Sequence, residues 1–194
     1  IDPEVLQSLP DREFTSAMSE VIKYGAIMDR VFFNLIEENI DDILYNKNLS
    51  LLTKIISGCA QIKSDVVVDD AREGGRRRIL NFGHTIGHGL ETYFGFETLR
   101  HGEAISYGMI AAGKLSNEHQ KLSIEHCELL EKTINKLPLP DLPQFDSLEV
   151  LKIIQNDKKI QNGSLHFILL EEIGRAVVGN NINEKSIINV LEDL

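Results

Sequence analysis

Apolar residues recur at helical spacing along most of this chain, and this period limits the fold more than any other feature of the sequence. The first segment opens with the start signal Ser8-Leu9-Pro10-Asp11 and continues with Phe14, Met18, Ile22 and Ala26. Steps of three or four residues place side chains on one face of an α-helix, where they can be buried together. We therefore expect a mainly α, multihelical protein.

The later segments extend this interpretation. Asp29, Asp146 and Asn183 each stand where they can cap a following helix, and Gly95 is expected to end the helix that contains two histidines. Further helices are expected over residues 51–70, 77–94, 103–115, 123–136 and 147–155, with a last helix after residue 183.

Only one part of the chain carries a convincing strand signal. Residues 165–170, a turn containing Gly174, and residues 176–178 predict a small β-hairpin near the C-terminus. Strands and helices do not alternate elsewhere, and the sequence has no GxGxxG pattern, no P-loop and no internal repeat. We therefore expect no nucleotide-binding domain within this chain.

One expected helix carries an unusual polar face. Four residues in steps of four, three and four fall within a sector of about 60°: Arg77, Asn81, His84 and His88. A solvated polar stripe is the plain structural explanation of such a face. Gly83 and Gly87 favour a functional role, because each costs up to about 1 kcal/mol relative to Ala in a helix interior and lets a backbone or ligand come close.

The sequence also offers the ligands of a divalent metal. His101 follows the two earlier histidines in a second polar turn, and Glu20 lies upstream. Imidazole nitrogen and carboxylate oxygen bind zinc and similar ions, and a catalytic site uses three protein ligands so that one position stays open for substrate or water. The chain therefore contains the residue types that a catalytic metal site requires.

The net charge of −10 argues against a nucleic-acid-binding surface, which requires clustered Lys and Arg. Arg76–Arg78 is the local exception. A solvated charge run is one interpretation; the other is an anion pocket, because guanidinium groups fit phosphate or carboxylate. Consecutive helical residues cannot all face one way, so Arg77, on the face of His84, is the preferred anion contact.

Apolar runs in the sequence are far shorter than the roughly 20 residues that cross a bilayer. No basic-then-apolar signal segment opens the chain. We therefore expect a cytoplasmic protein with no membrane partner.

Four blocks of the sequence resemble the signature blocks of the 3-dehydroquinate synthase family, in order and with matching spacing: residues 19–25, 77–91, 99–104 and 157–159. Enzymes of this family have an amino-terminal NAD-binding α/β domain followed by a helical domain, and the chain resembles only the second. The resemblance implies one helical metal- and substrate-binding domain over residues 1–194, with the N-terminal NAD-binding domain absent from this chain.

The activity implied by the resemblance is that of a metal- and NAD-dependent, phosphate-eliminating carbon–oxygen lyase of the shikimate pathway of aromatic amino acid biosynthesis. Such enzymes convert 3-deoxy-D-arabino-heptulosonate 7-phosphate to 3-dehydroquinate and phosphate, through transient oxidation, β-elimination, re-reduction, ring opening and aldol closure. The isolated domain is expected to be inactive, because NAD would be bound mainly by the missing domain.

The resemblance also implies roles for individual residues. The ligands of Zn²⁺ or Co²⁺ would be Glu20, His84 and His101, and His88 would contact substrate or phosphate. Three further residues match positions that contact the sugar phosphate substrate: Lys63, Arg77 and Asn81. Lys23 matches a position near the metal carboxylate.

Lys158 and Lys159 allow two interpretations, a solvated pair or one lysine that lines the anion site. Three departures from the family pattern stand out: Gly89 where Ala is usual, Arg100 before His101 where the family varies, and His166 where Lys or Arg is commoner. His166 puts in doubt a phosphate contact from its strand.

Alternative functions remain open at this point. One is another sugar-phosphate cyclase of the same superfamily; the other is a non-catalytic helical interaction module. The intact ligand set favours chemistry over the module, and the Gly-His-Thr-Ile-Gly-His block favours dehydroquinate synthesis. The expected partners are the NAD-binding domain and the substrate, and a homodimer is left open.

Overall fold

A computed structural model describes residues 1–69, 76–95, 97–159, 166–179 and 182–194, except for the side chains of residues 69, 76 and 157–159. The elements follow in this order: η1 (Pro3–Ser8), α1 (Asp11–Met28), α2 (Arg30–Asn46), α3 (Leu49–Asp69), η2 (Arg76–Asn81), α4 (His84–Phe94), α5 (His101–Glu118), α6 (Ile124–Ile134), α7 (Ser147–Lys159), β1 (Phe167–Glu172), β2 (Arg175–Gly179) and α8 (Glu184–Glu192). The expected mainly α protein with one C-terminal hairpin is confirmed.

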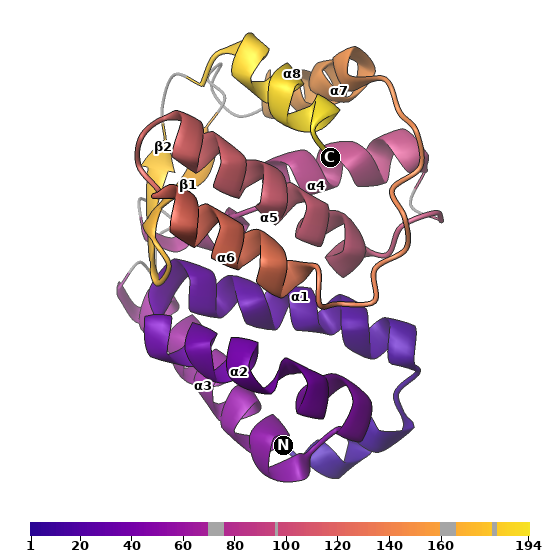
Figure 1. The fold of residues 1–194 in the computed structure, drawn as a ribbon, viewed down its shortest axis with the longest axis vertical. Coiled ribbons are helices and arrows are strands. Elements are labelled where there is room, and N and C mark those ends of the chain that lie inside the picture. The colour runs from indigo at the N-terminus through magenta and orange to yellow at the C-terminus, as the bar shows by residue number, and fades with distance from the viewer. Residues whose placement is uncertain (70–75, 96, 160–165, 180–181) are drawn as a thin grey trace.

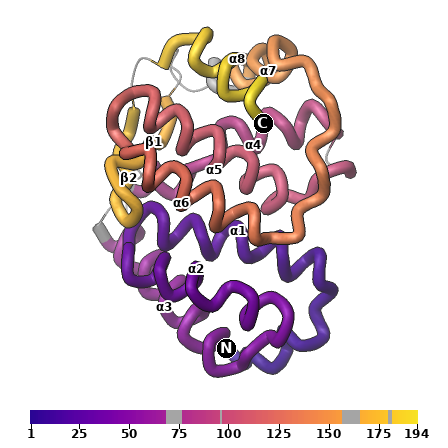
Figure 2. The backbone as a smooth tube through the Cα atoms, viewed as in Figure 1, coloured from indigo at the N-terminus to yellow at the C-terminus, as the bar shows by residue number. Residues whose placement is uncertain are grey.

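The helices stack in levels around α1 and α5. Helices α2 and α3 cover one side of α1, while α5 and α6 lie against its other side, and α4 packs on α5 (Figure 1). Helices α7 and α8 form the far end, and the hairpin covers one edge (Figure 1). The N-terminus lies beside α2 and α3, whereas the C-terminus lies among the helices at the other end (Figure 2). Among the described helices, none is long and apolar enough to cross a membrane.

Two groups of buried side chains hold these levels together. The larger joins α1, α2 and α3 to α5, α6 and the hairpin, and includes Ile22, Phe33 and Phe82. The smaller joins α4 and α5 to α7 and α8, and includes Leu90 and Ile187. Because helix α5 contributes to both groups, it fixes the position of α1 relative to α4.

The predicted helix caps are confirmed. Asp29 accepts a hydrogen bond from the backbone N–H of Phe32 at 3.0 Å, and Asn183 accepts one from Ser186 at 2.8 Å. Asp146 accepts one from Leu148 at 2.8 Å before α7. Such side-chain oxygens satisfy donors that have no partner inside the helix.

The hairpin is antiparallel and pairs Phe167 with Gly179 and Leu170 with Ala176. Gly174 adopts φ +96° in its turn, and its backbone N–H donates to the carbonyl of Ala26 at 2.8 Å. The turn therefore packs on the end of α1.

The predicted continuous helix over residues 77–94 is wrong. Residues 76–81 form the 3₁₀-helix η2, and α4 begins only at His84, because Gly83 adopts φ +78°. A Cβ on Gly83 would lie 2.6 Å from Cγ and 2.9 Å from the backbone nitrogen of Met109. The chain turns here so that α5 can approach closely, and Arg77 and Asn81 do not share a helical face with His84 through α-helical periodicity.

Candidate metal centre

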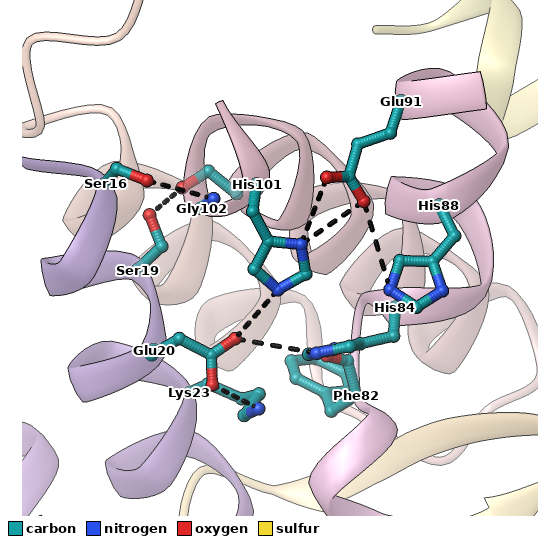
Figure 3. Close-up of polar contacts among 11 residues, drawn as sticks. Ser16, Ser19, Glu20, Lys23, Phe82, His84, His88, Glu91, His101 and Gly102 are labelled. Atoms are coloured by element: carbon teal, nitrogen blue, oxygen red, sulfur yellow. Dashed lines mark hydrogen bonds and ion pairs between the residues drawn. The ribbon is translucent and has the colours of Figure 1, made fainter. Parts of the chain in front are cut away.

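Three helices converge on a polar site, where α1 contributes Glu20, α4 contributes His84 and His88, and α5 begins at His101 (Figure 3). Helix α4 can lie this close to α5 because Gly87 and Gly108 have no side chains: a Cβ on Gly87 would lie 2.6 Å from Cδ1 of Ile105. The small residues noticed in the sequence thus admit a neighbouring helix, and Ala at Gly87 would crowd it.

The carboxylate of Glu20 faces two imidazole rings (Figure 3). Its Oε1 lies 3.5 Å from Nε2 of His84 and 3.9 Å from Nε2 of His101. The other oxygen, Oε2, accepts a hydrogen bond from Nζ of Lys23 at 2.6 Å. Lys23 therefore fixes the carboxylate so that Oε1 is turned toward the histidines.

Hydrogen bonds at Nδ1 orient both rings. Nδ1 of His84 lies 3.1 Å from the carbonyl oxygen of Phe82, and Nδ1 of His101 lies 3.1 and 3.2 Å from the two carboxylate oxygens of Glu91. Carbonyl and ionised carboxylate oxygens can only accept, so each Nδ1 donates and each Nε2 of the neutral ring carries a lone pair. Both lone pairs are therefore available on the side of Glu20.

The electrostatics of this arrangement are only partly compensated. Lys23 pairs with Oε2 of Glu20, but Oε1 is buried and has no hydrogen-bond partner among the described residues. Burial lowers the pKa of His84 to about 4, and the positive charge of Lys23 acts in the same direction. Burial also lowers the pKa of Lys23, against the opposing effect of Glu20. A neutral His84 is the form that binds metals.

The residues fit a divalent metal. Zinc binds nitrogen and oxygen ligands at about 2.0–2.2 Å, so two ligands of a tetrahedral ion lie roughly 3.3 Å apart. The distances from Oε1 of Glu20 to the two Nε2 atoms are 3.5 and 3.9 Å. A small closure would bring Oε1 to ligand spacing from each of the two nitrogens, and the buried oxygen without a partner would gain one.

His88 forms a histidine cluster with His84 and His101. One ring nitrogen from each of the three lies within 4.8 Å of the other two. The cluster alone therefore does not decide which three donors bind a metal. Nε2 of His88 lies 3.9 Å from Oε2 of Glu91, while Nε2 of His84 and of His101 face Glu20. We favour Glu20 over His88 because Glu20 holds the buried, unpartnered oxygen.

The residues expected to contact substrate differ in the element that carries them and in how exposed they are. Lys63 is exposed on α3, and its positive charge lowers the pKa of Lys23, although burial is the larger cause. Arg77 is half-buried in η2, which packs against α1 and α3, and Asn81 is exposed at the end of η2. The side chains of Lys158 and Lys159 lie outside the described residues.

Glu91 is the site residue that the sequence reasoning missed. It ends the block of residues 77–91, but no role follows for it from the metal argument. Its position three residues after His88 and seven after His84 places all three side chains on one face of α4. That spacing was the available signal.

Comparison with known proteins shows the family of the chain. Residues 17–160 match the family model described as 3-dehydroquinate synthase C-terminal. The 3-dehydroquinate synthase of Rippkaea orientalis is 41% identical over 196 residues, which cover 98% of this chain and 53% of the relative. That of Prochlorococcus marinus (strain MIT 9303) is 42% identical over 197 residues, covering 100% of this chain and 53% of the relative. The chain thus spans about half the length of these curated relatives.

Solved structures share the fold. A 2-epi-5-epi-valiolone synthase from Streptomyces hygroscopicus subsp. jinggangensis, with NAD⁺ and Zn²⁺ bound, matches with a TM-score of 0.90 at 22% identity, over 100% of this chain and 54% of that one. A 2-deoxy-scyllo-inosose synthase complexed with carbaglucose-6-phosphate, NAD⁺ and Co²⁺ matches with a TM-score of 0.84 at 25% identity, over 99% of this chain and 55% of that one.

Proposed function

The chain belongs to the 3-dehydroquinate synthase family, and from this membership we propose that it is the metal- and substrate-binding part of a 3-dehydroquinate synthase. The reaction would convert 3-deoxy-D-arabino-heptulosonate 7-phosphate to 3-dehydroquinate and phosphate. The proposed partner is an NAD-binding domain, since the curated relatives are about twice as long as this chain.

One observation carries the proposal: a buried carboxylate oxygen of Glu20 has no hydrogen-bond partner and faces the Nε2 atoms of His84 and His101. Leaving one buried carboxylate oxygen without a hydrogen bond costs about 1–3 kcal/mol, even though Lys23 pairs with the other oxygen. A divalent ion held by these three residues would give that oxygen a partner. When bound, it would polarise a substrate hydroxyl as a Lewis acid.

The other residues bind and orient the substrate in this proposal. Lys63 and Arg77 offer cationic donors to phosphate or carboxylate, and Asn81 offers an amide. His88, half exposed and beside Glu91, is placed to contact the phosphate or to move a proton at a substrate oxygen. Lys158 and Lys159 are proposed as further anion contacts on the strength of the family resemblance. NAD would accept and return the hydride from its own domain.

The ligand assignment predicts that metal affinity depends on His84 and only weakly on His88. Removal of one ligand of three in His84→Ala should cost on the order of several kcal/mol of zinc binding, whereas His88→Ala should leave the ligand set intact. Isothermal titration of zinc into both variants measures this. Equal losses would place His88 among the ligands and contradict the assignment.

The substrate assignment has its own test in the polypeptide that joins this chain to an NAD-binding domain. Phosphate release with NAD⁺ and zinc should be rapid from 3-deoxy-D-arabino-heptulosonate 7-phosphate and negligible from glucose 6-phosphate, which lacks a carboxylate. The reverse preference would favour another cyclase of the superfamily. The chain by itself should turn over neither compound.

A further inference from the structure

Glu91 is a buried carboxylate placed between two histidines (Figure 3). Its side chain is only 9% exposed, and among the ion pairs between described residues both of its partners are imidazoles. One is His101, with Nδ1 at 3.1 Å from Oε1, and the other is His88, with Nε2 at 3.9 Å from Oε2. Among the described residues, no helix cap or Lys–Glu pair explains this carboxylate.

The contact with His101 determines which ring nitrogen faces Glu20. His101 is the first residue of α5 and its side chain is 49% exposed, so packing alone leaves its ring free to turn. The carboxylate accepts from Nδ1–H, which leaves the lone pair on Nε2, 3.9 Å from Oε1 of Glu20. Carboxylates that bind the second nitrogen of a metal-ligating histidine fix its tautomer and raise its basicity.

The contact with His88 has the opposite consequence. His88 and Glu91 are one helical turn apart on α4, and Nε2 of His88 faces the carboxylate of Glu91. Nε2 of His88 is thus turned toward Glu91, while the Nε2 atoms of His84 and His101 face Glu20, and this difference in direction keeps His88 out of the proposed ligand set. Its centroid nevertheless lies only 5.3 Å from that of His84 and 5.7 Å from that of His101.

We propose that Glu91 is the positioning residue of this centre: it directs Nε2 of His101 toward Glu20 and holds His88 aside as a substrate contact. The proposal rests on the metal site put forward under the proposed function. In this proposal one carboxylate gives two neighbouring histidines different tasks.

The test compares zinc affinity and the visible spectrum of bound Co²⁺ in the full chain for wild type, Glu91→Gln and Glu91→Ala. Glu91→Gln should lower zinc affinity roughly tenfold to a hundredfold, as expected for loss of an outer partner of a ligating histidine, and should change the Co²⁺ spectrum. Glu91→Ala should lower it further. A matched control is Glu103→Gln, which alters a buried carboxylate on α5 that binds Arg12 and no histidine, and should change zinc affinity less than about threefold.

A double-mutant cycle tests the second half of the proposal. If Glu91 holds His88 aside, His88→Ala should lower zinc affinity more in the Glu91→Gln background than in wild type, because the released ring can then bind the ion. Additive effects would contradict this.

The outcomes separate the two proposals. Wild-type zinc affinity and an unchanged Co²⁺ spectrum in Glu91→Gln overturn the positioning role alone, provided that His84→Ala still abolishes tight binding. Equal losses in Glu91→Gln and Glu103→Gln overturn it too, since general loosening would explain both. If His84→Ala does not weaken zinc binding, the metal site itself fails.

Discussion

Two adjoining regions along helices α4 and α5 differ in how closely they are packed and in how completely their polar groups are paired. The glycine seam, formed by Gly83, Gly87 and Gly108, brings the two backbones together with no spare space. The histidine cluster, beside it, faces an oxygen of Glu20 that has no hydrogen-bond partner among the described residues, and it includes His84, whose pKa burial lowers to about 4. One region is closely packed and the other is electrostatically incomplete.

The seam is the more rigid because its contacts are between backbones. A Cβ on Gly108 would lie 2.0 Å from the carbonyl oxygen of Gly83 and 2.8 Å from the backbone nitrogen of Gly87. Gly102, at the start of α5, is similarly close to α1, where its N–H donates to Oγ of Ser16 at 3.0 Å. These contacts fix the relative positions of the three helices that supply the proposed ligands.

From this contrast we infer that polar ligand atoms can remain without partners only where tightly packed helices hold them in place. Without the seam, Glu20 and the histidines could separate and be solvated, and the proposed site would be lost. Preorganised ligands on rigid elements are what a specific metal site requires.

The largest effect is expected from a substitution that disrupts the glycine seam. Gly108→Ala should destabilise the protein by about 3 kcal/mol or more, because a backbone carbonyl cannot move aside as a flexible side chain can. The control is Gly113→Ala on the same helix, where the new Cβ would lie 3.0 Å from Cδ2 of Leu130 and 3.9 Å from Sγ of Cys127, both side-chain atoms. Its net change should stay within about 1 kcal/mol, since Ala favours the helix. Urea unfolding measures both variants. Equal destabilisation would contradict the claim that the backbone contacts of the seam tolerate an added Cβ less well than side-chain contacts do.

A smaller effect is expected where α5 is tied to α1 by charge. The Glu103 side chain is 1% exposed and accepts from Nε of Arg12 at 2.6 Å and from the backbone N–H of Arg100 at 2.8 Å. Glu103→Gln should cost about 2 kcal/mol, the scale of a charged hydrogen bond in a buried place. Glu171→Gln, which removes an exposed pair with Arg175, should cost less than about 0.5 kcal/mol. Similar losses in urea unfolding would contradict this contrast.

The smallest effect, taken over one pH unit, is a pH dependence that comes from His84 in the histidine cluster. Because the pKa of His84 is about 4 in the folded protein and about 6.5 ordinarily, the unfolded chain binds more protons between these values. The free energy of unfolding should therefore fall as pH decreases through this window, by up to about 1.4 kcal/mol per pH unit.

Metal-free urea unfolding at pH 6 and pH 5 measures this dependence. His84→Asn should flatten the decrease, because the group that titrates is removed. His88→Asn should retain it, since His84 is still present in that variant. A wild-type slope in His84→Asn would show that the cluster does not limit stability at low pH.

Local features of the fold could be predicted from the sequence because their causes lie within a few residues. The caps at Asp29, Asp146 and Asn183, the stop at Gly95 and the hairpin turn at Gly174 all act within about one turn of backbone. The predicted helix over residues 77–94 failed because an apolar and polar period does not reveal a left-handed glycine. What breaks that helix is the approach of α5, which is distant in sequence.

For the proposed site, the kinds of ligand atom and their order along the chain follow from the sequence alone, because residue types and family resemblance do not depend on the three-dimensional arrangement. Only the tertiary structure decided which atoms face one another: Oε1 of Glu20 toward two Nε2 atoms, and Glu91 between His88 and His101. These choices depend on the distance between α1, α4 and α5, which packing across the glycine seam sets. Periodicity along one helix places side chains on its own faces and cannot report how close another helix will come.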